Sequence, residues 1–338
     1  MRKFDVNAVK QLLESPKKIV ITTHFKPDGD AMGSSLGLYN YLIQLNHHVQ
    51  VVTPSDYPEF LYFLPGNDNV INFEANPEAA VKACNDAELI FCLDFNNASR
   101  VERFSETLVN TKATKILIDH HLSPSDFCEY TYSYTDACAT AELIYDFILS
   151  LDDEKRINEA IATCLYTGIM TDTGSFRFNS ATADVHRKVA ALMDKGANNA
   201  KIHEAVYDNA SEERLRLLGY CLSNKLKVMP EYHTAVVWIS RDEILKFNHK
   251  TGDTEGLVNY ALGIKGIKMA AFFTERKDMV KASFRSRGDF SVKDFSEKYF
   301  EGGGHKNAAG GSSHLSLEAS VEKFISLLPE YKDQLEKA

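Results

Sequence analysis

Three short apolar runs in the first half of the chain end at acidic or histidine side chains. The runs cover residues 19–21, 89–93 and 116–118, and the side chains that follow them are His24, Asp28, Asp30, Asp94, Asp119, His120 and His121. Each run is continuous rather than alternating, which is typical of strands buried on both faces of a parallel sheet. Ligands of open α/β sheets bind beyond the carboxyl ends of such strands. We therefore expect these side chains to meet in one crevice.

Helical patterns alternate with these runs through the first half of the chain. The expected helices are 5–15, a helix opened by Gly33 that continues to about 45, 77–83 and 156–170, and a further strand is expected at 49–52. The last of these helices ends in TDTG, which adds the carboxylate of Asp172. Strands that alternate with helices predict an α/β layer fold with a parallel sheet.

The second half begins with two charged, alanine-rich helical stretches, 181–195 and 198–225, which are interpreted as a connector. Strands are then expected at 234–239, 269–274 and 280–286, followed by a glycine-rich loop at 301–311 and a final helix near 316–328. The length of 338 residues favours two domains. We predict an N-terminal domain at 1–190, a helical connector at 191–230 and a smaller C-terminal α/β domain at 231–338.

Composition limits the kinds of partner and compartment. The net charge of −9 means that a polyanionic substrate needs a local basic patch. None of the six cysteines forms a CxxC pair, so they are interpreted as buried thiols of a reduced, cytoplasmic protein. No apolar stretch reaches about 18 residues, so no membrane span is predicted.

Six of the side chains named above form a set that suits divalent cations. They are His24, Asp28, Asp30, Asp94, His120 and Asp172. Such a set suits Mn²⁺, with Mg²⁺, Co²⁺ or Fe²⁺ as alternatives, and the lack of cysteine ligands argues against structural zinc. Four clustered carboxylates repel one another, and two cations that share one aspartate would relieve the repulsion. Two ions about 3.5–4 Å apart can activate water and stabilise a phosphoryl displacement. His121 could donate a hydrogen bond to a phosphate or to the leaving group.

Each motif alone also has a simpler structural interpretation. The DHH tripeptide can be a helix cap, DGD can be a turn or a calcium-like loop, and TDTG can be a helix end. Their occurrence in this order, each behind an apolar element, favours a shared site. The pair His47-His48 lies in a polar turn with no acid beside it and is interpreted as surface.

The strand expected at 279–287 has a basic face and an apolar face. Lys281, Ser283, Arg285 and Arg287 alternate with Val280, Ala282 and Phe284. A solvated edge strand would show the same pattern. The nearby glycines favour anion binding, because successive glycines let backbone N–H groups approach an anion closely.

Five segments of the chain resemble the DHH phosphoesterase superfamily. THFKPDGDAMGS, FCLDFNNASR, LIDHHLS and GIMTDTGSFRF resemble its four N-terminal motifs, and GGGHKNAAGG resembles the glycine-rich motif of its DHHA1 domain. The SFRSR and GGGHKNAAGG segments are similar to the nanoRNase/pAp phosphatase branch. The resemblance implies a bifunctional enzyme that trims short oligoribonucleotides to mononucleotides and converts 3′-phosphoadenosine 5′-phosphate (pAp) to AMP.

The resemblance also implies roles for individual residues. It places one ion at His24, Asp28 and Asp94, and a second at Asp30, Asp94, His120 and Asp172, with Asp94 as the bridge. Asp119 would orient the histidine pair, His121 would face the substrate phosphate, and Arg285, His305 and the amides of Gly303 and Gly304 would bind the nucleotide's other phosphate. Glu301 departs from the family pattern, since a further glycine is common there. A homodimer is implied by the family alone.

Three competing functions remain open at this point. An inorganic pyrophosphatase shares the DHH motifs, but it needs a different, lysine-rich C-terminal site. A phosphodiesterase for linear dinucleotides of the pApA type is not separated by the sequence from a nanoRNase. A non-catalytic nucleic-acid-binding module is disfavoured, because all four N-terminal motifs keep their candidate ligands.

Overall fold

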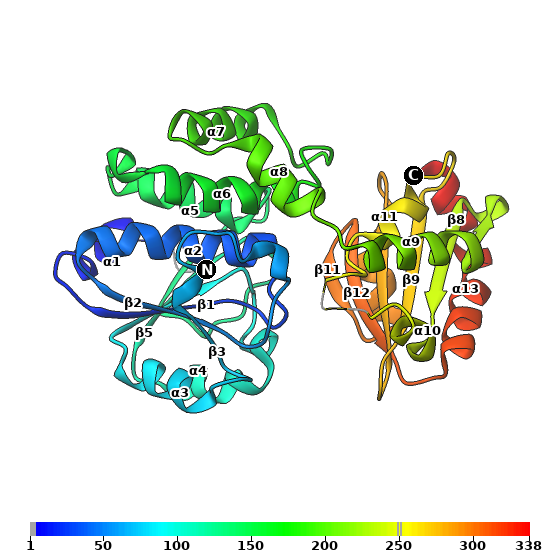
Figure 1. The fold of residues 1–338 in the computed structure, drawn as a ribbon, viewed down its shortest axis with the longest axis horizontal. Coiled ribbons are helices and arrows are strands. Elements are labelled where there is room, and N and C mark those ends of the chain that lie inside the picture. The colour runs from blue at the N-terminus through cyan, green and yellow to red at the C-terminus, as the bar shows by residue number, and fades with distance from the viewer. Residues whose placement is uncertain (1–4, 249, 251) are drawn as a thin grey trace. The chain divides into compact units, whose positions relative to one another are not determined.

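The computed structural model describes residues 5–248, 250 and 252–338, which form two compact units, 1–209 and 210–338 (Figure 1). The helices of the first unit are α1 (Val6–Leu12), α2 (Gly29–Leu42), α3 (Pro77–Asp86), α4 (Ser105–Asn110), α5 (Thr140–Ser150), α6 (Glu159–Asp172), α7 (Ala183–Asp194) and α8 (Asn199–Tyr207). Its strands are β1 (Lys18–Thr22), β2 (His48–Thr53), β3 (Val70–Asn72), β4 (Leu89–Leu93), β5 (Thr114–Asp119) and β6 (Tyr130–Ser133).

The first unit is built on one parallel sheet with the strand order β3-β2-β1-β4-β5-β6. The chain moves outward in one direction from β1 to β3 and in the other direction from β4 to β6. The order therefore reverses between β1 and β4, which is the point where doubly wound sheets open a crevice at their carboxyl edge. The predicted parallel sheet is confirmed.

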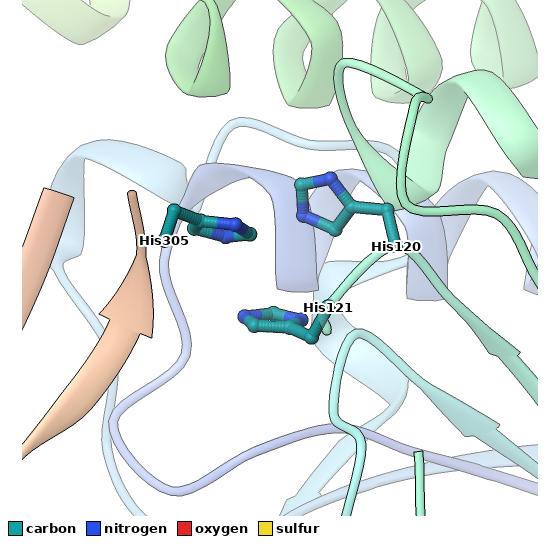
Figure 2. A group of neighbouring side chains, drawn as sticks. All are labelled: His120, His121 and His305. Atoms are coloured by element: carbon teal, nitrogen blue, oxygen red, sulfur yellow. The ribbon is translucent and has the colours of Figure 1, made fainter. Parts of the chain in front are cut away.

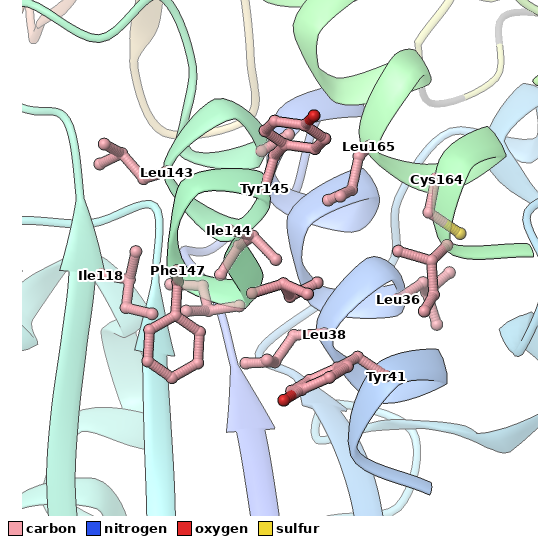
Figure 3. Close-up of a cluster of buried hydrophobic side chains, with 14 of the residues drawn as sticks. Leu36, Leu38, Tyr41, Ile118, Leu143, Ile144, Tyr145, Phe147, Cys164 and Leu165 are labelled. Atoms are coloured by element: carbon pink, nitrogen blue, oxygen red, sulfur yellow. The ribbon is translucent and has the colours of Figure 1, made fainter. Parts of the chain in front are cut away.

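Helices cover both faces of this sheet, which explains its continuous apolar strands. Ile19 and Ile21 of β1 belong to a large core shared with α2, α5 and α6, whereas Val20 belongs to the opposite core with α3 and α4. Figure 1 shows these helices on the two faces of the sheet. Figure 3 shows the larger core, to which Leu36 of α2, Ile118 of β5 and Leu165 of α6 all contribute side chains.

Both helices that carry candidate ligands, α2 and α6, begin at positions other than those predicted from the sequence. α2 begins at Gly29 rather than at Gly33, because Asp28 acts as its N-cap and accepts hydrogen bonds from the amides of Asp30 and Ala31. Asp30 therefore lies in the first turn of the helix and not in a loop. α6 begins at Glu159 rather than at 156 and extends to Asp172.

The second unit contains a mixed sheet with the order β11-β12-β10-β9-β8-β7, in which only β8 and β9 pair in parallel. Its strands are β7 (Leu226–Met229), β8 (Thr234–Ile239), β9 (Met269–Glu275), β10 (Val280–Ser286), β11 (Gly303–His305) and β12 (Ala308–Ser313). Its helices are α9 (Glu212–Asn224), α10 (Arg241–Leu245), α11 (Leu257–Leu262), α12 (Val292–Tyr299) and α13 (Leu317–Lys337). The predicted fold class, a parallel-sheet domain followed by a smaller α/β domain, is confirmed.

Several expectations for the second half need correction. The glycine-rich segment 301–311 is not a loop, because most of it forms β11 and β12, which pair as a hairpin. The stretch 198–225 is not one helix: it divides into α8, which belongs to the first unit, and α9, which belongs to the second. The boundaries 1–190, 191–230 and 231–338 stay a prediction.

All six cysteines are buried free thiols. The interpretation of His47 as a surface residue is wrong: it is 5% exposed, and its Nδ1 accepts a hydrogen bond from the amide of Lys17.

Candidate functional site

The candidate site of the first unit lies where β1, β4 and β5 end. His24 follows β1, Asp94 directly follows β4, and His120 directly follows β5. Asp30 comes from the first turn of α2, and Asp172 is the last residue of α6. The structure thus brings the six predicted cation-binding side chains together at the carboxyl edge, around the reversal between β1 and β4.

One group of donors consists of His24, Asp28 and Asp94. Nε2 of His24 lies 3.9 Å from Oδ1 of Asp28 and 3.5 Å from Oδ2 of Asp94. One ligand atom from each residue lies within 4.8 Å of the other two. His24 and Asp94 are buried, whereas the Asp28 side chain is 46% exposed and faces solvent.

A second group consists of Asp30, His120 and Asp172. Nε2 of His120 lies 3.8 Å from Oδ2 of Asp30 and 3.6 Å from Oδ2 of Asp172, and these ligand atoms also lie within 4.8 Å of one another. The same Nε2 lies 3.5 Å from Oδ1 of Asp94. Asp94 therefore presents Oδ2 to the first group and Oδ1 to the second.

Both buried histidines are oriented by backbone carbonyls. Nδ1 of His24 lies 2.9 Å from the carbonyl oxygen of Phe25, and Nδ1 of His120 lies 3.2 Å from that of Ala137. A carbonyl accepts only from N–H, so each Nδ1 carries a proton and each Nε2, on the carboxylate side, can offer a lone pair to a cation. Backbone partners of this kind orient metal-binding histidines, and they leave the Nε2 atoms facing the carboxylates. The two donor groups can hold metal ions.

The backbone at Asp94 is strained. Its φ is 65°, in the left-handed region that residues other than glycine rarely occupy. Its amide donates to the carbonyl of Ile118 at 3.1 Å, which fixes it against β5. Strain of this kind persists where surrounding structure enforces it, and it clusters at functional sites.

The N-terminus of α5 supplies hydrogen bonds that the sequence analysis missed. The amides of Thr140 and Ala141 donate to Oδ2 and Oδ1 of Asp30 at 2.6 and 2.8 Å, and the Thr140 hydroxyl donates to Oδ1 of Asp94 at 2.9 Å. The signal was present in the sequence, since TAELIYDFIL has helical apolar spacing behind a threonine and an early glutamate.

Burial and mutual repulsion keep protons on part of this cluster. Burial raises the pKa of Asp172 to about 6, and burial together with the charges of Asp94 and Asp172 raises the pKa of Asp30 well above its usual range. Burial would also raise the pKa of Asp94, but the neighbouring histidines, His24 foremost, lower it instead. Carboxylates that cannot all ionise together are stabilised in their charged form by cations.

His121 adds a proton donor beside the cluster. Its Nδ1 donates to Oδ1 of Asp119 at 2.7 Å and lies 3.7 Å from Oδ1 of Asp94. Burial would lower the pKa of His121, but the hydrogen bond with Asp119 and the charges of Asp94 and Asp119 raise it to about 9. Its ring meets that of His120 edge-on, with centroids 5.0 Å apart (Figure 2). The neighbouring carboxylates therefore favour the protonated form of His121.

Comparison with known proteins places this geometry in a family. Residues 18–169 match the model of the DHH family, N-terminal domain, and residues 231–334 match that of the DHHA1 domain. The bifunctional oligoribonuclease and PAP phosphatase NrnA of Thermus thermophilus is 33% identical over 327 residues, which cover 96% of this chain and 93% of that protein.

The chain belongs to the DHH family of phosphoesterases.

Further relatives support this membership. The protein of the same name from Bacillus subtilis is 28% identical, with 89% of this DHH chain and 91% of that protein covered. The crystal structure of an exopolyphosphatase-related protein from Bacteroides fragilis is similar with a TM-score of 0.94 and 38% identity, and it covers 99% of both chains. Among the described residues, no helix is both long and apolar enough to cross a membrane.

In the DHHA1 domain, two predicted substrate-binding side chains lie on the two strands that flank β12. Arg285 of β10 and His305, the last residue of β11 (labelled in Figure 2), both lie opposite Ala308 of β12. Directly opposed residues of antiparallel strands share a face, so Arg285 and His305 project from the same face of the sheet. The apolar residues of β10 are buried on the other face, which confirms its predicted alternation.

Gly303 and Gly304 form the start of β11, but their surroundings differ. Gly304 has a φ of 135°, and an added Cβ would lie 2.6 Å from the carbonyl oxygen of Ala308, so the fold requires glycine there. Among the described residues, an added Cβ at Gly303 would come within 4.0 Å of Glu297 alone. The fold therefore does not require glycine at 303, and its backbone is open to close approach.

Proposed function

We propose that this DHH chain hydrolyses short oligoribonucleotides to mononucleotides and converts pAp to AMP. The names of the Thermus thermophilus and Bacillus subtilis relatives, which are bifunctional oligoribonucleases and PAP phosphatases, support both reactions. Coverage of at least nine tenths of each relative supports the transfer of the whole activity rather than of one domain's function.

The observation that carries the proposal is the sharing of Asp94 between two donor groups. We propose that His24, Asp28 and Asp94 hold one divalent ion, and that Asp30, Asp94, His120 and Asp172 hold a second. Mn²⁺ is the ion we propose, because the set combines carboxylate oxygens with two imidazoles, and Mg²⁺ and Co²⁺ are alternatives. When bound, such ions activate water for attack on phosphorus and neutralise charge on the phosphoryl group.

The protein's own groups supply the remaining chemistry. His121 is held by Asp119 at 2.7 Å and the neighbouring carboxylates raise its pKa, so it can donate a hydrogen bond to a phosphate oxygen or a proton to the leaving oxygen. Asp119 is 0% exposed and holds the imidazole in one orientation. Asp94, in its strained backbone conformation, keeps its two oxygens on opposite donor groups.

We propose that the DHHA1 domain binds the substrate rather than cleaving it. Arg285 and His305 share one sheet face and can bind a second phosphate of the nucleotide. The backbone amides of Gly303 and Gly304 can add hydrogen bonds to the same anion. A homodimer, which the family resemblance implies, stays a prediction.

A substrate panel with controlled metal content tests the proposal. The chain is stripped with EDTA and assayed with Mn²⁺, Mg²⁺ or Co²⁺ on an RNA dinucleotide, pAp, pApA, pyrophosphate and a long RNA. We expect Mn²⁺-dependent release of mononucleotides from the dinucleotide and of AMP from pAp. Exclusive cleavage of pyrophosphate, or equal turnover in EDTA, would overturn it. Faster cleavage of pApA than of the RNA dinucleotide would favour the linear-dinucleotide phosphodiesterase.

A further inference from the structure

Lys188 of α7 lies in a pocket of carboxylates beside α5. Its Nζ lies 2.7 Å from Oε1 of Glu142, 2.7 Å from Oδ2 of Asp146 and 3.4 Å from Oδ2 of Asp184. The Lys188 side chain is 16% exposed and that of Glu142 is 9% exposed, whereas the Asp184 side chain is 64% exposed. Lys188 and Glu142 thus form an ion pair largely removed from solvent.

Glu142 connects this ion pair to the backbone before α5. Its second carboxylate oxygen, Oε2, accepts a 2.8 Å hydrogen bond from the amide of Cys138. The Glu142 carboxylate therefore links α7 to the turn 137–141, a segment that ends in the first two residues of α5. Lys188 fixes the orientation of this carboxylate. A carboxylate in the first turn of a helix is also favoured by the helix dipole.

The turn 137–141 holds three of the proposed cation-binding side chains. The carbonyl of Ala137 accepts from His120, and the amides of Thr140 and Ala141 donate to Asp30. The hydroxyl of Thr140 donates to Asp94. The turn therefore contacts members of both donor groups, and a shift of its backbone would move ligands of both.

We propose that Lys188 and Glu142 are positioning residues: they hold the backbone of the turn 137–141 where it contacts both donor groups. The inference rests on the proposed metal-dependent function and extends it to an ion pair outside the set of six proposed ligands. Loss of the pair would release the Cys138 amide and let the turn move. The consequence is a loss of cation affinity, because replacing an outer partner of a metal ligand typically weakens metal affinity by about 10–100-fold.

A purely structural role for this ion pair predicts something different. Asp146 would still hold Lys188, and therefore α7, against α5 if Glu142 lost its charge. If the role of the pair is purely structural, its substitution would change the melting temperature without changing cation affinity. A positioning pair would change the affinity even in variants that remain fully folded.

The test measures binding of Mn²⁺ to the EDTA-stripped full chain by the electron paramagnetic resonance signal of free Mn²⁺, together with thermal unfolding in EDTA. The variants are Glu142→Gln, Lys188→Met, the double variant and Lys188→Arg. Lys195→Met is the matched control, because Lys195 follows the same helix and pairs at 3.8 Å with Glu154, away from the turn.

We expect Glu142→Gln and Lys188→Met each to weaken Mn²⁺ binding by about tenfold, and the double variant to lose little more, since the two residues act as a unit. Lys188→Arg should restore most of the affinity, and Lys195→Met should bind like the wild type. Equal affinity in all folded variants, or an equal loss in Lys195→Met, would overturn the inference. If one variant does not fold, the other single variant decides. Failure of the wild type itself to bind Mn²⁺ would instead refute the proposed function.

Discussion

The hydroxyl of Thr140 donates a 2.9 Å hydrogen bond to Oδ1 of Asp94, the same oxygen that lies 3.5 Å from Nε2 of His120. The other oxygen of Asp94 lies 3.5 Å from Nε2 of His24. The threonine therefore fixes the rotation of the carboxylate, so that one oxygen faces each donor group. A residue outside the recognisable motifs thus sets the orientation of the carboxylate that joins them.

Replacing Thr140 with valine keeps the shape of the side chain and removes this hydrogen bond. We expect Thr140→Val to weaken Mn²⁺ binding and to lower kcat by about tenfold, as is usual for outer partners of metal ligands. Thr140→Ser keeps the hydroxyl and should behave like the wild type. Calorimetric Mn²⁺ titration and pAp hydrolysis measure the two effects. Equal behaviour of the valine and serine variants would show that the hydroxyl is not needed.

Asp94 should be indispensable for both reactions, because it belongs to both donor groups. We expect Asp94→Ala to lower turnover of pAp and of an RNA dinucleotide by about a thousandfold or more, which corresponds to several kcal/mol of lost transition-state stabilisation. Asp126→Asn, at an exposed aspartate, serves as the control. Substantial residual turnover of Asp94→Ala in Mn²⁺ would refute the bridging role.

Arg285 should contribute to substrate binding and not to bond cleavage. We expect Arg285→Ala to raise KM for pAp by about tenfold or more, because the variant loses a charge-assisted hydrogen bond to the substrate. Hydrolysis of a simple aryl phosphate, which lacks a second phosphate, should change little. Lys281→Ala removes a charge from the same face of β10 and is the matched control. An equal loss on pAp and the aryl phosphate would contradict this division of labour.

The sequence predicted which side chains of the candidate site lie close together better than it predicted the elements that support them. His24, Asp94 and His120 each follow an apolar strand, and the carboxyl edge of a parallel sheet brings such positions together whatever the intervening loops do. The prediction therefore needed only strand type and order. It did not need the exact start of α2, which was misplaced because Asp28 was interpreted as a loop residue although it is the N-cap.

The supporting contacts could not be predicted in the same way. The segment TAELIYDFIL carries a local helix pattern, but no local pattern indicates that the N-terminus of this helix, α5, faces Asp30 and donates to it from Thr140 and Ala141. The hairpin of β11 and β12 was interpreted as a loop, because its glycines have low strand propensity. Tertiary pairing with β10 determines its conformation instead.

The close approach of α2 and α6 depends on glycine at position 33. A Cβ on Gly33 would lie 2.6 Å from the carbonyl oxygen of Cys164 and 2.8 Å from the amide of Gly168, both of which are backbone atoms that cannot move independently of α6. We expect Gly33→Ala to destabilise the fold by about 1–3 kcal/mol and to weaken Mn²⁺ binding, since α2 carries Asp30 and α6 carries Asp172.

Gly219 of α9 provides the matched control for Gly33. It is also a helical glycine, but an added Cβ would meet nothing within 4 Å among the described residues. Gly219→Ala should stabilise the chain by about 0.5–1 kcal/mol, because alanine loses less conformational entropy than glycine in a helix. Chemical denaturation measures both changes. A destabilised Gly219→Ala or a neutral Gly33→Ala would contradict the packing argument.

Glu243 of α10 should make stability depend on pH in the acidic range. Burial alone would raise the pKa of Glu243, but hydrogen bonds from Lys225 at 2.5 Å, Tyr220 at 2.6 Å and Ser240 at 3.0 Å lower it to about 2. A pKa lower in the folded than in the unfolded state stabilises the fold above the unfolded value, near 4.5, and this stabilisation is lost as pH falls toward 2.

Glu243→Gln should therefore be less stable than the wild type by about 1–3 kcal/mol at pH 7, because it removes the charged partner of Lys225. The difference should shrink as pH falls from 4.5 toward 2, where the glutamate of the wild type becomes protonated. Urea denaturation at a series of pH values measures this difference. A stability difference that stayed constant down to pH 2 would show that the ionised carboxylate does not stabilise the fold. Glu243 would then act only as a neutral acceptor for the amide of Ser240.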